Sequence, residues 1–300
     1  MPPKKISQDY MKKIVPAKKS TVRRRKPAPK KSKTILTLKR VGYGLIVLAV
    51  LGLIAIGYHY RDGLAYYLSY KTDKVLKAEK EEKRISDVRI YEVLSKHDTK
   101  VIGFDVSQYQ GKIKWDSVKS INQNFNLGFV FIRATAGKNA ADLRFEENWK
   151  AAGKTNMVRG AYHYYRPNEN SIEQAENFIR TVRLRKGDLP PVLDIEQLPK
   201  NQSLDSLKKG LGKWLKRVEK AYGTKPIIYS GESYYSDFLQ DEFSEYTFWI
   251  ANYNFFVERI KDEWLFWQFT EKASVNGIKG NVDINIFNGT ENQLRNITIE

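Results

Sequence analysis

Residues 158–196 read VRGAYHYYRPNENSIEQAENFIRTVRLRKGDLPPVLDIE, and this stretch decides the fold class. It opens with a β-rich run, Val158–Tyr165, continues through a helix-like segment, Ser171–Leu184, and closes with a second β-rich run, Pro191–Glu196. A strand, a helix and a further strand in succession are typical of a βαβ unit with parallel strands. The stretch therefore predicts an α/β fold built on a parallel sheet.

The same rhythm extends outward from this unit in both directions. Helix-like segments at Phe145–Ala152 and Leu204–Tyr222 separate the neighbouring β-rich runs, whereas the last runs leave little room for long helices. Eight runs fit a closed barrel. We predict an irregular TIM-like barrel over residues 100–300, from runs at Val101–Val106, Phe129–Thr135, Val158–Tyr165, Pro191–Glu196, Pro226–Ser230, Tyr246–Tyr253, Trp264–Thr270 and Val282–Phe287.

Positive charge is concentrated at the start of the chain. The net charge is +18, but residues 1–40 hold fifteen Lys or Arg and one acid, Asp9. The other 260 residues carry 37 basic and 33 acidic side chains, a net of +4. Such asymmetry indicates a membrane or nucleic acid as a partner. Because this tail is rich in Pro and like charge, we expect residues 1–40 to be disordered.

An uncharged apolar run decides between these two partners. Val41 to Tyr58 reads VGYGLIVLAVLGLIAIGY, eighteen residues that are apolar on all sides of a helix. Its helical length approaches the ~30 Å of a bilayer core. We expect a transmembrane helix at 41–60 that lies in the lipid bilayer, rather than a core helix or a cleaved signal peptide. The basic residues before it predict a cytoplasmic N-terminus and an exported remainder, and no nucleic-acid partner is needed to explain the charge.

Residues 61–99 form a charged stem between the apolar run and the predicted barrel. The segment favours helix, and its apolar residues are too sparse to indicate a coiled coil. A solvated spacer helix is the favoured interpretation, and a dimerisation element is the alternative.

The rare residue types exclude several kinds of chemistry. The chain has no Cys, which excludes thiol nucleophiles, thiolate metal sites and disulfides. Its three His, His59, His97 and His163, supply little material for a His-based metal centre or a Ser-His-Asp triad. We therefore expect no metal and no organic cofactor, and we interpret His163 as a hydrogen-bonded core residue.

Acidic residues in the β-rich runs carry the strongest chemical signal. Asp194 and Glu196 flank Ile195, so strand alternation puts both carboxylates on one side. Two adjacent carboxylates disfavour double ionisation, and one proton is then held to higher pH, as a general acid requires. Asp105 and Asp283 lie in two further β-rich runs. Any one of these acids alone fits a cap or a surface turn, but the four together favour a carboxylate pair for acid–base chemistry on a glycosidic bond.

Aromatic residues accompany these acids in the predicted strands. Aromatic faces stack on the apolar faces of sugar rings, and tyrosine hydroxyls reach polar substituents. Core packing is the alternative interpretation of each ring. The candidates are Tyr162, Tyr164, Tyr229, Trp249, Tyr253 and Trp267.

Nine segments between Val101 and Phe287 form a series: GFDVSQYQG, FVFIRATAG, FEENWKAA, RGAYHYYRP, PPVLDIE, PIIYS, FWIANY, WQFT and NVDINIF. In this order and spacing they resemble the lysozymes of glycoside hydrolase family 25. The resemblance implies a (β/α)5β3 barrel. It also implies hydrolysis of the β-1,4 bond between N-acetylmuramic acid and N-acetylglucosamine in peptidoglycan glycan strands, for wall remodelling or turnover. The exported domain would then face the periplasm or the cell wall.

The resemblance implies roles for the residues already singled out. Glu196 corresponds to the general acid that protonates the leaving oxygen. Asp194 corresponds to a partner carboxylate that orients the acetamido group of the substrate or stabilises positive charge on the sugar. Asp105 and Asp283 correspond to supporting acids. Groove positions correspond to Tyr162, Tyr229, Tyr253, Trp267 and Gln268.

One position departs from the family pattern. The second strand of the family usually ends Ala-Thr-Glu-Gly, and in this chain Ala136 stands in place of the Glu. The lost carboxylate lies outside the catalytic pair, so an active hydrolase is the favoured interpretation. One alternative is a catalytically weakened glycan-binding module that tethers the membrane to the wall. Another is a hydrolase of a different acetamido-sugar polymer, such as chitin.

Overall fold

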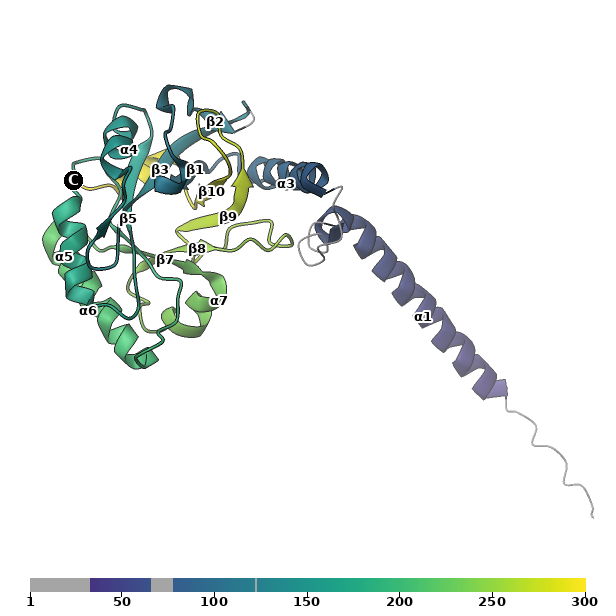
Figure 1. The fold of residues 1–300 in the computed structure, drawn as a ribbon. Helices are drawn as coiled ribbons and strands as arrows, with labels where there is room; N and C mark the ends of the chain where they lie inside the picture. Colours follow the sequence, from purple (N-terminus) through teal and green to yellow (C-terminus); the bar gives the residue numbers. More distant parts are fainter. Residues whose placement is uncertain (1–32, 66–77, 122) are drawn as a thin grey trace, which may run out of the picture. The chain divides into compact units, whose positions relative to one another are not determined.

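The computed structural model describes residues 33–65, 78–121 and 123–300 of the chain. The chain divides into two compact units, Met1–Ile56 and Gly57–Glu300, and the second contains the barrel (Figure 1). Helix α1 spans Lys33–His59. Its segment Gly42–His59 has a mean hydropathy of 1.8 and is not buried, so this helix is long and apolar enough to cross a membrane.

The N-terminal tail differs in part from its prediction. Residues 1–32 of the expected disordered tail lie outside the described residues. Residues 33–40 belong to helix α1, because KTILTLKR contains no helix breaker and leads directly into the apolar run.

Eight strands close into a barrel, as the sequence predicts. In order around the ring they are β1 (Val101–Val106), β3 (Phe125–Ala136), β5 (Val158–Tyr164), β6 (Val192–Asp194), β7 (Ile227–Gly231), β8 (Thr247–Ala251), β9 (Phe266–Ala273) and β10 (Val282–Phe287). The pairing of β1 with β3 completes the ring. Neighbouring strands from β1 to β9 are parallel, and β10 is antiparallel to both β9 and β1.

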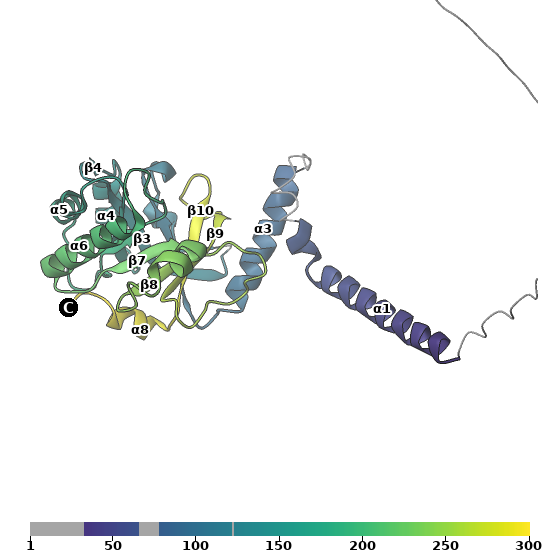
Figure 2. The ribbon, with the colours of Figure 1, turned by 90° about the horizontal axis from the view of Figure 1, so that it is seen from below.

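Three long helices cover the outside of the sheet (Figures 1 and 2). They are α4 (Phe145–Ala152), α5 (Ser171–Thr181) and α6 (Leu204–Tyr222). Shorter elements complete the domain: η1 (Gln108–Gln110), η2 (Trp115–Ser117), β2 (Ser120–Ile121), β4 (Ala140–Ala141), α7 (Glu232–Tyr234), η3 (Tyr235–Leu239) and α8 (Glu291–Asn296). The finer (β/α)5β3 pattern stays a prediction, since the connection from β1 to β3 contains the short turns η1 and η2.

Caps explain where two of these helices begin and end. The Asn170 side chain accepts hydrogen bonds from the backbone N–H groups of Ile172 and Glu173 at the start of α5. The Ser203 side chain caps α6 in the same way, and Gly223 ends that helix at φ 72°, a left-handed conformation that glycine adopts without strain. Helix α6 therefore has the bounds that the sequence predicts, whereas α5 is three residues shorter than its predicted range, Ser171–Leu184.

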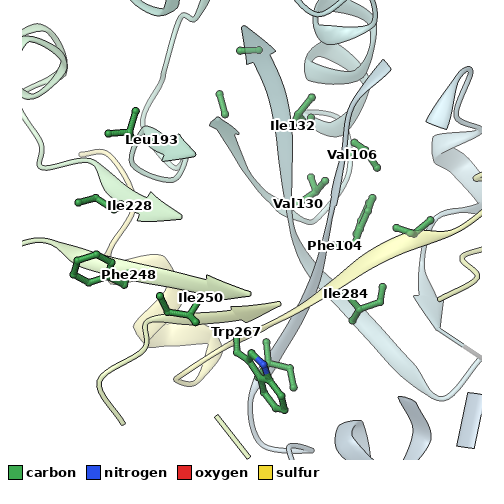
Figure 3. Close-up of a cluster of buried hydrophobic side chains, with 14 of the residues drawn as sticks. Phe104, Val106, Val130, Ile132, Leu193, Ile228, Phe248, Ile250, Trp267 and Ile284 are labelled. Carbon is green, nitrogen blue, oxygen red and sulfur yellow. The ribbon is translucent and has the colours of Figure 1, made fainter. Parts of the chain in front are cut away.

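Alternation along the strands separates two hydrophobic cores. Side chains that face the lumen form one cluster, in which the Phe131 ring stacks on Trp249 at 4.5 Å. Side chains that face outward pack under the helices and form the other, where Figure 3 labels Phe104, Val106, Val130, Ile132, Leu193, Ile228, Phe248, Ile250, Trp267 and Ile284. Adjacent residues of a strand go to opposite cores, so strand register decides which polar side chains reach the lumen.

Helix α3 (Ala78–Ser95) packs on β9 within the same compact unit as the barrel. Ile90, Val93 and Leu94 are buried in the outer core, and His97 is buried beside them. The end of the stem is therefore packed on the barrel and not solvated on all sides, and the boundary at residue 100 stays a prediction. Ile90, Val93 and Leu94 fall at positions i, i+3 and i+4 and form one apolar stripe of α3, and His97 follows in the turn after the helix.

Polar contacts join α3 to the loop that follows β8. Arg89 is 4% exposed, and its guanidinium donates to the backbone oxygens of Tyr253 at 2.9 Å and Asn254 at 2.8 Å. His97 Nε2 accepts from the backbone N–H of Ile260 at 3.2 Å. The end of the stem thus holds a loop of the barrel in place.

Candidate active site

The four candidate acids line one cavity at the end of the barrel where the parallel strands terminate. Asp194 ends β6, and Asp105 on β1 lies opposite Asp283 on β10. The cavity, which we name the acid pocket, has a volume of about 320 Å³ and is lined by Asp105, Tyr162, Asp194, Glu196, Tyr229, Trp249, Tyr253, Gln268, Glu271 and Asp283. The structure thus brings together eight of the nine site residues that the sequence predicts.

Backbone contacts hold Asp194 and Glu196 on the same side of the chain. The N–H of Ile195 donates to the backbone oxygen of Tyr229 at 3.0 Å. Ser230 Oγ donates to the backbone oxygen of Ile195 at 2.6 Å. Because the Ile195 side chain is buried in the outer core, the residues before and after it face the acid pocket.

Asp194 and Glu196 form a pair of neighbouring carboxyl groups in the acid pocket. Each of the two groups shifts the pKa of the other. Burial raises the pKa of Asp194 well above its ordinary value, and the neighbouring charge of Glu196 raises it further. Burial also raises the pKa of Glu196, and the hydrogen bond to Asp194 opposes that rise. The pair therefore keeps a proton at a pH where an isolated carboxyl group is ionised.

One oxygen of Asp194 has no hydrogen-bond partner among the described residues. Asp194 is 4% exposed, and its Oδ1 atom is fully buried. A buried acceptor without a donor is costly, so native proteins rarely leave one unexplained. Asp194 also lines the acid pocket, so the unpartnered acceptor lies at the wall of the candidate site.

Two amide side chains hold Asp105. Its Oδ2 accepts from Gln268 Nε2 at 2.7 Å and from Asn285 Nδ2 at 2.8 Å. Burial raises the pKa of Asp105 to about 6, although these two hydrogen bonds lower it. Asp283 is hydrogen bonded to Asp105, and burial and then the Asp105 charge raise the pKa of Asp283 to about 9. Asp283 is therefore the protonated member of this second pair at neutral pH.

Two tyrosines fix the orientation of Gln268. The Tyr229 hydroxyl donates to Gln268 Oε1 at 2.8 Å, and the Tyr253 hydroxyl donates to the same oxygen. The amide nitrogen of Gln268 is thereby turned toward Asp105. Burial raises the pKa of Tyr229, so this hydroxyl stays a neutral donor, and Tyr253 is 38% exposed at the rim of the pocket.

The prediction for Trp267 is wrong. Its side chain is fully buried in the outer core, 5.9 Å from the His97 ring, and its indole N–H donates to the backbone oxygen of Asn252 at 2.9 Å. The physical reason is alternation along β9, because the adjacent Gln268 faces the lumen and Trp267 must face the opposite way.

Sequence reasoning missed Asn285 and Glu271. Asn285 follows Asp283 by two residues on β10, so the period of the strand could have identified it as a lumen residue. Its Oδ1 accepts from Trp249 Nε1 at 2.8 Å, which orients its amide toward Asp105. Glu271 reaches the acid pocket where the register between β9 and β10 shifts, and no local pattern predicts that irregularity.

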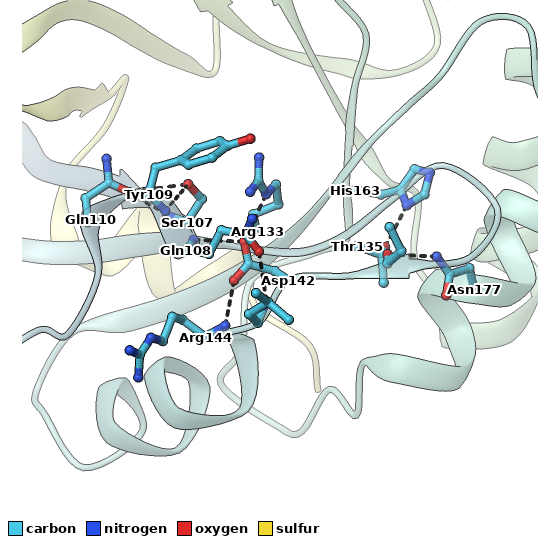
Figure 4. Close-up of polar contacts among 12 residues, drawn as sticks. Ser107, Gln108, Tyr109, Gln110, Arg133, Thr135, Asp142, Arg144, His163 and Asn177 are labelled. Carbon is cyan, nitrogen blue, oxygen red and sulfur yellow. Dashed lines mark hydrogen bonds and ion pairs between the residues drawn. The ribbon is translucent and has the colours of Figure 1, made fainter.

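His163 is a core residue, as the sequence predicts. Its Nδ1 lies 2.6 Å from Thr135 Oγ1, and its Nε2 lies 3.2 Å from Gln174 Oε1 (Figure 4 shows the contact with Thr135). Burial lowers the pKa of His163 to about 3, so the ring is neutral. Among the described residues, no group of His, Cys, Asp or Glu side chains is arranged to hold a metal ion.

A second cavity adjoins the acid pocket and shares Glu196 with it. This flanking groove has a volume of about 510 Å³. Its walls come from β7, β8 and the segments that follow them, and include Tyr229, Glu232, Tyr234 and Tyr253. The volume of this groove is within the range of ligand-binding sites, and Glu196 lies where the two cavities meet.

A closed α/β barrel with a pair of neighbouring carboxyl groups, supporting acids and a tyrosine-rich wall is the arrangement of a glycoside hydrolase. The chain belongs to the family described as glycosyl hydrolases family 25, whose model matches residues 104–278.

Curated and solved relatives agree with this membership. An uncharacterized protein of Escherichia coli strain K12, YegX, is 42% identical over 198 residues, which cover 64% of this chain and 71% of that protein. Lysozyme M1 of Streptomyces globisporus is 32% identical over 209 residues, which cover 65% of this chain and 70% of that protein. The solved structure of a family 25 glycosyl hydrolase from Bacillus anthracis superposes with a TM-score of 0.60 at 32% identity, covering 67% of this chain and 94% of that one.

Proposed function

We propose that this protein is a peptidoglycan hydrolase, a muramidase that cleaves the β-1,4 bond between N-acetylmuramic acid and N-acetylglucosamine. The observation that carries the proposal is the pair of Asp194 and Glu196, which line one pocket together with Asp105 and Asp283. Similarity to lysozymes of Streptomyces globisporus and Clostridium acetobutylicum supports the choice of substrate.

Glu196 acts in this proposal as the general acid. It lines both the acid pocket and the flanking groove, so a glycosidic oxygen that passes from one to the other comes within its reach. Glu196 donates its proton to that oxygen as the bond to the anomeric carbon breaks. In the second step the resulting carboxylate accepts a proton from the attacking water, which restores the acid.

Asp194 acts in this proposal on the acetamido group of the substrate. The Asp194 carboxyl group accepts the acetamido N–H, and the acetamido oxygen then bonds to the anomeric carbon as the leaving group departs. Retaining enzymes with a carboxylate nucleophile separate their two carboxyl groups by about 5–5.5 Å. In this proposal the acetamido oxygen is the nucleophile, so that separation is not required, and the expected outcome is net retention.

The remaining pocket residues position the sugar. Asp105 is oriented by Gln268 and Asn285 and presents an acceptor to substrate hydroxyl groups. Protonated Asp283 lies beside it in the same pocket and stabilises the Asp105 carboxylate. The exposed part of Tyr253 offers a ring face at the rim, and Tyr162 and Tyr229 form deeper walls.

A membrane anchor fits the proposed role in wall remodelling or turnover. Helix α1 is compatible with a single span, and the fifteen basic residues of 1–40 favour a cytoplasmic N-terminus. The catalytic domain would then lie on the periplasmic or wall side.

A second candidate is a glycan-binding module with weakened catalysis, and the replacement of the family Glu by Ala136 favours it. The full chain in detergent is incubated with purified peptidoglycan, and released reducing ends are counted. We expect release, and Glu196→Gln should lower its rate by about 10²–10⁴-fold, the usual contribution of a general acid. The exposed Glu263→Gln is the matched control. Binding without release would support the tether, and preference for chitin would change the substrate.

The stereochemical outcome is tested separately. Proton NMR of the products of the wild-type enzyme should show the β anomer first, because two inversions at the anomeric carbon give retention. An α anomer formed first would contradict assistance by the acetamido group.

A further inference from the structure

A third cavity lies beside the acid pocket, at the ends of β3 and β5. It has a volume of about 370 Å³, and we name it the arginine pocket because Arg133 and Arg166 line it together with Ala136, Asp142 and Tyr164. Arg133 pairs in register with Tyr162, a residue of the acid pocket. A polymer that crosses the acid pocket toward β3 therefore passes directly over the arginine pocket.

Arg133 is a fixed cation. Its Nε donates to Asp142 Oδ2 at 3.0 Å, and its guanidinium lies 4.7 Å from the centre of the Tyr109 ring (Figure 4). Asp142 is itself held by the backbone N–H groups of Gln108 at 2.9 Å and Arg144 at 2.9 Å. The Arg133 side chain is 14% exposed, and its contacts to described residues use Nε, so its terminal nitrogens remain as donors.

Arg166 supplies a second, more mobile cation. Its side chain is 46% exposed and forms an ion pair of 3.2 Å with Glu169, which is a weak surface interaction. The positive charge of Arg133 also lowers the pKa of Asp194, and the charges of both arginines lower that of Tyr164. Their field therefore extends across the boundary between the two pockets.

The departure at Ala136 makes this pocket available to an anion. Ala136 ends β3 and pairs with Ala140 across a tight hairpin, so small side chains form that wall. A Glu at this position, as in the family pattern, would place a carboxylate in the pocket with the two arginines. Its absence leaves space beside both guanidinium groups, whose ion pairs with Asp142 and Glu169 engage only part of their donors.

The opposite side of the active site has the reverse character. The flanking groove is lined by Glu196 and Glu232, and Glu232 forms an ion pair of 2.6 Å with Lys261. No Lys or Arg stands among the described residues that line this groove, so an anionic group is attracted more strongly to the arginine pocket, and charge can set the direction in which an alternating polymer binds.

We propose that the arginine pocket binds a carboxylate substituent of the glycan strand and thereby places the carboxylate-bearing sugar on the β3 side of the acid pair. The proposal rests on the proposed function, which supplies the glycan strand. Two sources of carboxylate share this chemistry: the stem peptides of intact peptidoglycan, and the lactyl group that is freed when those peptides are removed.

The test compares substrates that differ only in charge. The full chain in detergent is given peptidoglycan with native carboxylates and the same material after carbodiimide amidation. We expect KM to be about 5- to 10-fold lower for the native form, the size of one charge-assisted contact, with little change in kcat. Peptide-stripped strands, with and without amidation of the lactyl group, identify the source. If the enzyme still prefers the unamidated form of the stripped strands, the pocket binds the lactyl carboxylate. If that preference disappears on stripped strands, the pocket binds a carboxylate of the stem peptide.

Two variants connect the preference to the pocket. Ala136→Glu should reduce the native-to-amidated ratio to about one, and Arg166→Gln should reduce it in part, by removing one of two donors. Lys150→Gln, which changes net charge equally on exposed α4, should leave the ratio as in wild type. No preference in the wild type, or a full preference in Ala136→Glu, would overturn the assignment.

Failure of the proposed function gives a different result. A wild-type chain that releases no reducing ends from any of these substrates contradicts the hydrolase. In that case, dissociation constants for soluble stripped strands and for their amidated forms still test whether the arginine pocket binds carboxylate. If the wild type binds the carboxylate form more tightly and Ala136→Glu does not, the pocket binds carboxylate without hydrolysis. Equal binding of the two forms by the wild type rejects the proposal.

Discussion

Replacing Arg89 with methionine tests whether helix α3 belongs to the catalytic unit. Methionine keeps the apolar length of the side chain and removes its charge and donors. Arg89 is 4% exposed and donates to the backbone oxygens of Tyr253 and Asn254 at 2.9 and 2.8 Å. Tyr253 is also hydrogen bonded to Gln268, which orients Asp105. The substitution therefore affects both stability and the site.

The magnitude follows from these contacts. Each hydrogen bond from a charged donor contributes about 1.5–3 kcal/mol, so two give about 3–6 kcal/mol before the desolvation of the guanidinium is counted. Removing a buried charge recovers part of that amount. We expect Arg89→Met to lower the free energy of unfolding by about 2–4 kcal/mol, and to lower kcat through the displaced Tyr253.

The assay is urea unfolding of the full chain in detergent, followed by tryptophan fluorescence, together with release of reducing ends. Arg84→Met on the same helix is the control, because Arg84 is exposed and contacts Glu81 one turn away. Arg89→Lys should give an intermediate result, since lysine keeps the charge but lacks the forked geometry. If Arg89→Met and Arg84→Met both unfold at the wild-type urea concentration, α3 is not part of the unit.

Two further predictions concern the second acid pair. The raised pKa of Asp283, about 9, means that the folded state binds a proton that the unfolded state releases above about pH 4, so stability falls as pH rises through this window. In Asp283→Asn the thermal midpoint should therefore fall less between about pH 5 and 9 than in wild type. The exposed control Asp262→Asn should keep the wild-type pH dependence. A change in the thermal midpoint of Asp283→Asn that is equal at every pH would contradict this linkage. Asn285→Leu removes one of two amide donors to Asp105, so the pKa of Asp105 should rise above about 6 and the acidic limb of kcat/KM should move to higher pH. An unmoved limb would show that ionised Asp105 is not required.

Much of the barrel and the acid pair could be predicted from the sequence because their signals are local. The β-rich runs are continuous in sequence, and each of the eight contains or overlaps a strand of the ring. Alternation about Ile195 places Asp194 and Glu196 on one side without reference to the rest of the chain. The same rule would have found Asn285 and excluded Trp267, if it had been applied from Asp283 and Gln268.

Helix α3 shows where local signals fail. Its apolar stripe of three residues is too short to distinguish a docked helix from a solvated one by pattern alone. The outer core around β9 decides the matter, because it offers a surface that buries Ile90, Val93 and Leu94. In the sequence Arg89 is one of many charged residues of the stem. Only the folded structure brings it to the backbone oxygens of Tyr253 and Asn254, which accept its hydrogen bonds.

By itself the sequence determined the strand order along the chain, the apolar helix and the chemical identity of the acids, since each depends on neighbours a few residues apart. The tertiary structure alone decided which carboxyl groups keep protons, how Glu271 enters the acid pocket and how Asp142 fixes Arg133 beside it. Those outcomes depend on burial and on contacts between distant strands. Desolvation and the distances between charged groups arise only when the chain folds, so they cannot be inferred from a local stretch of sequence.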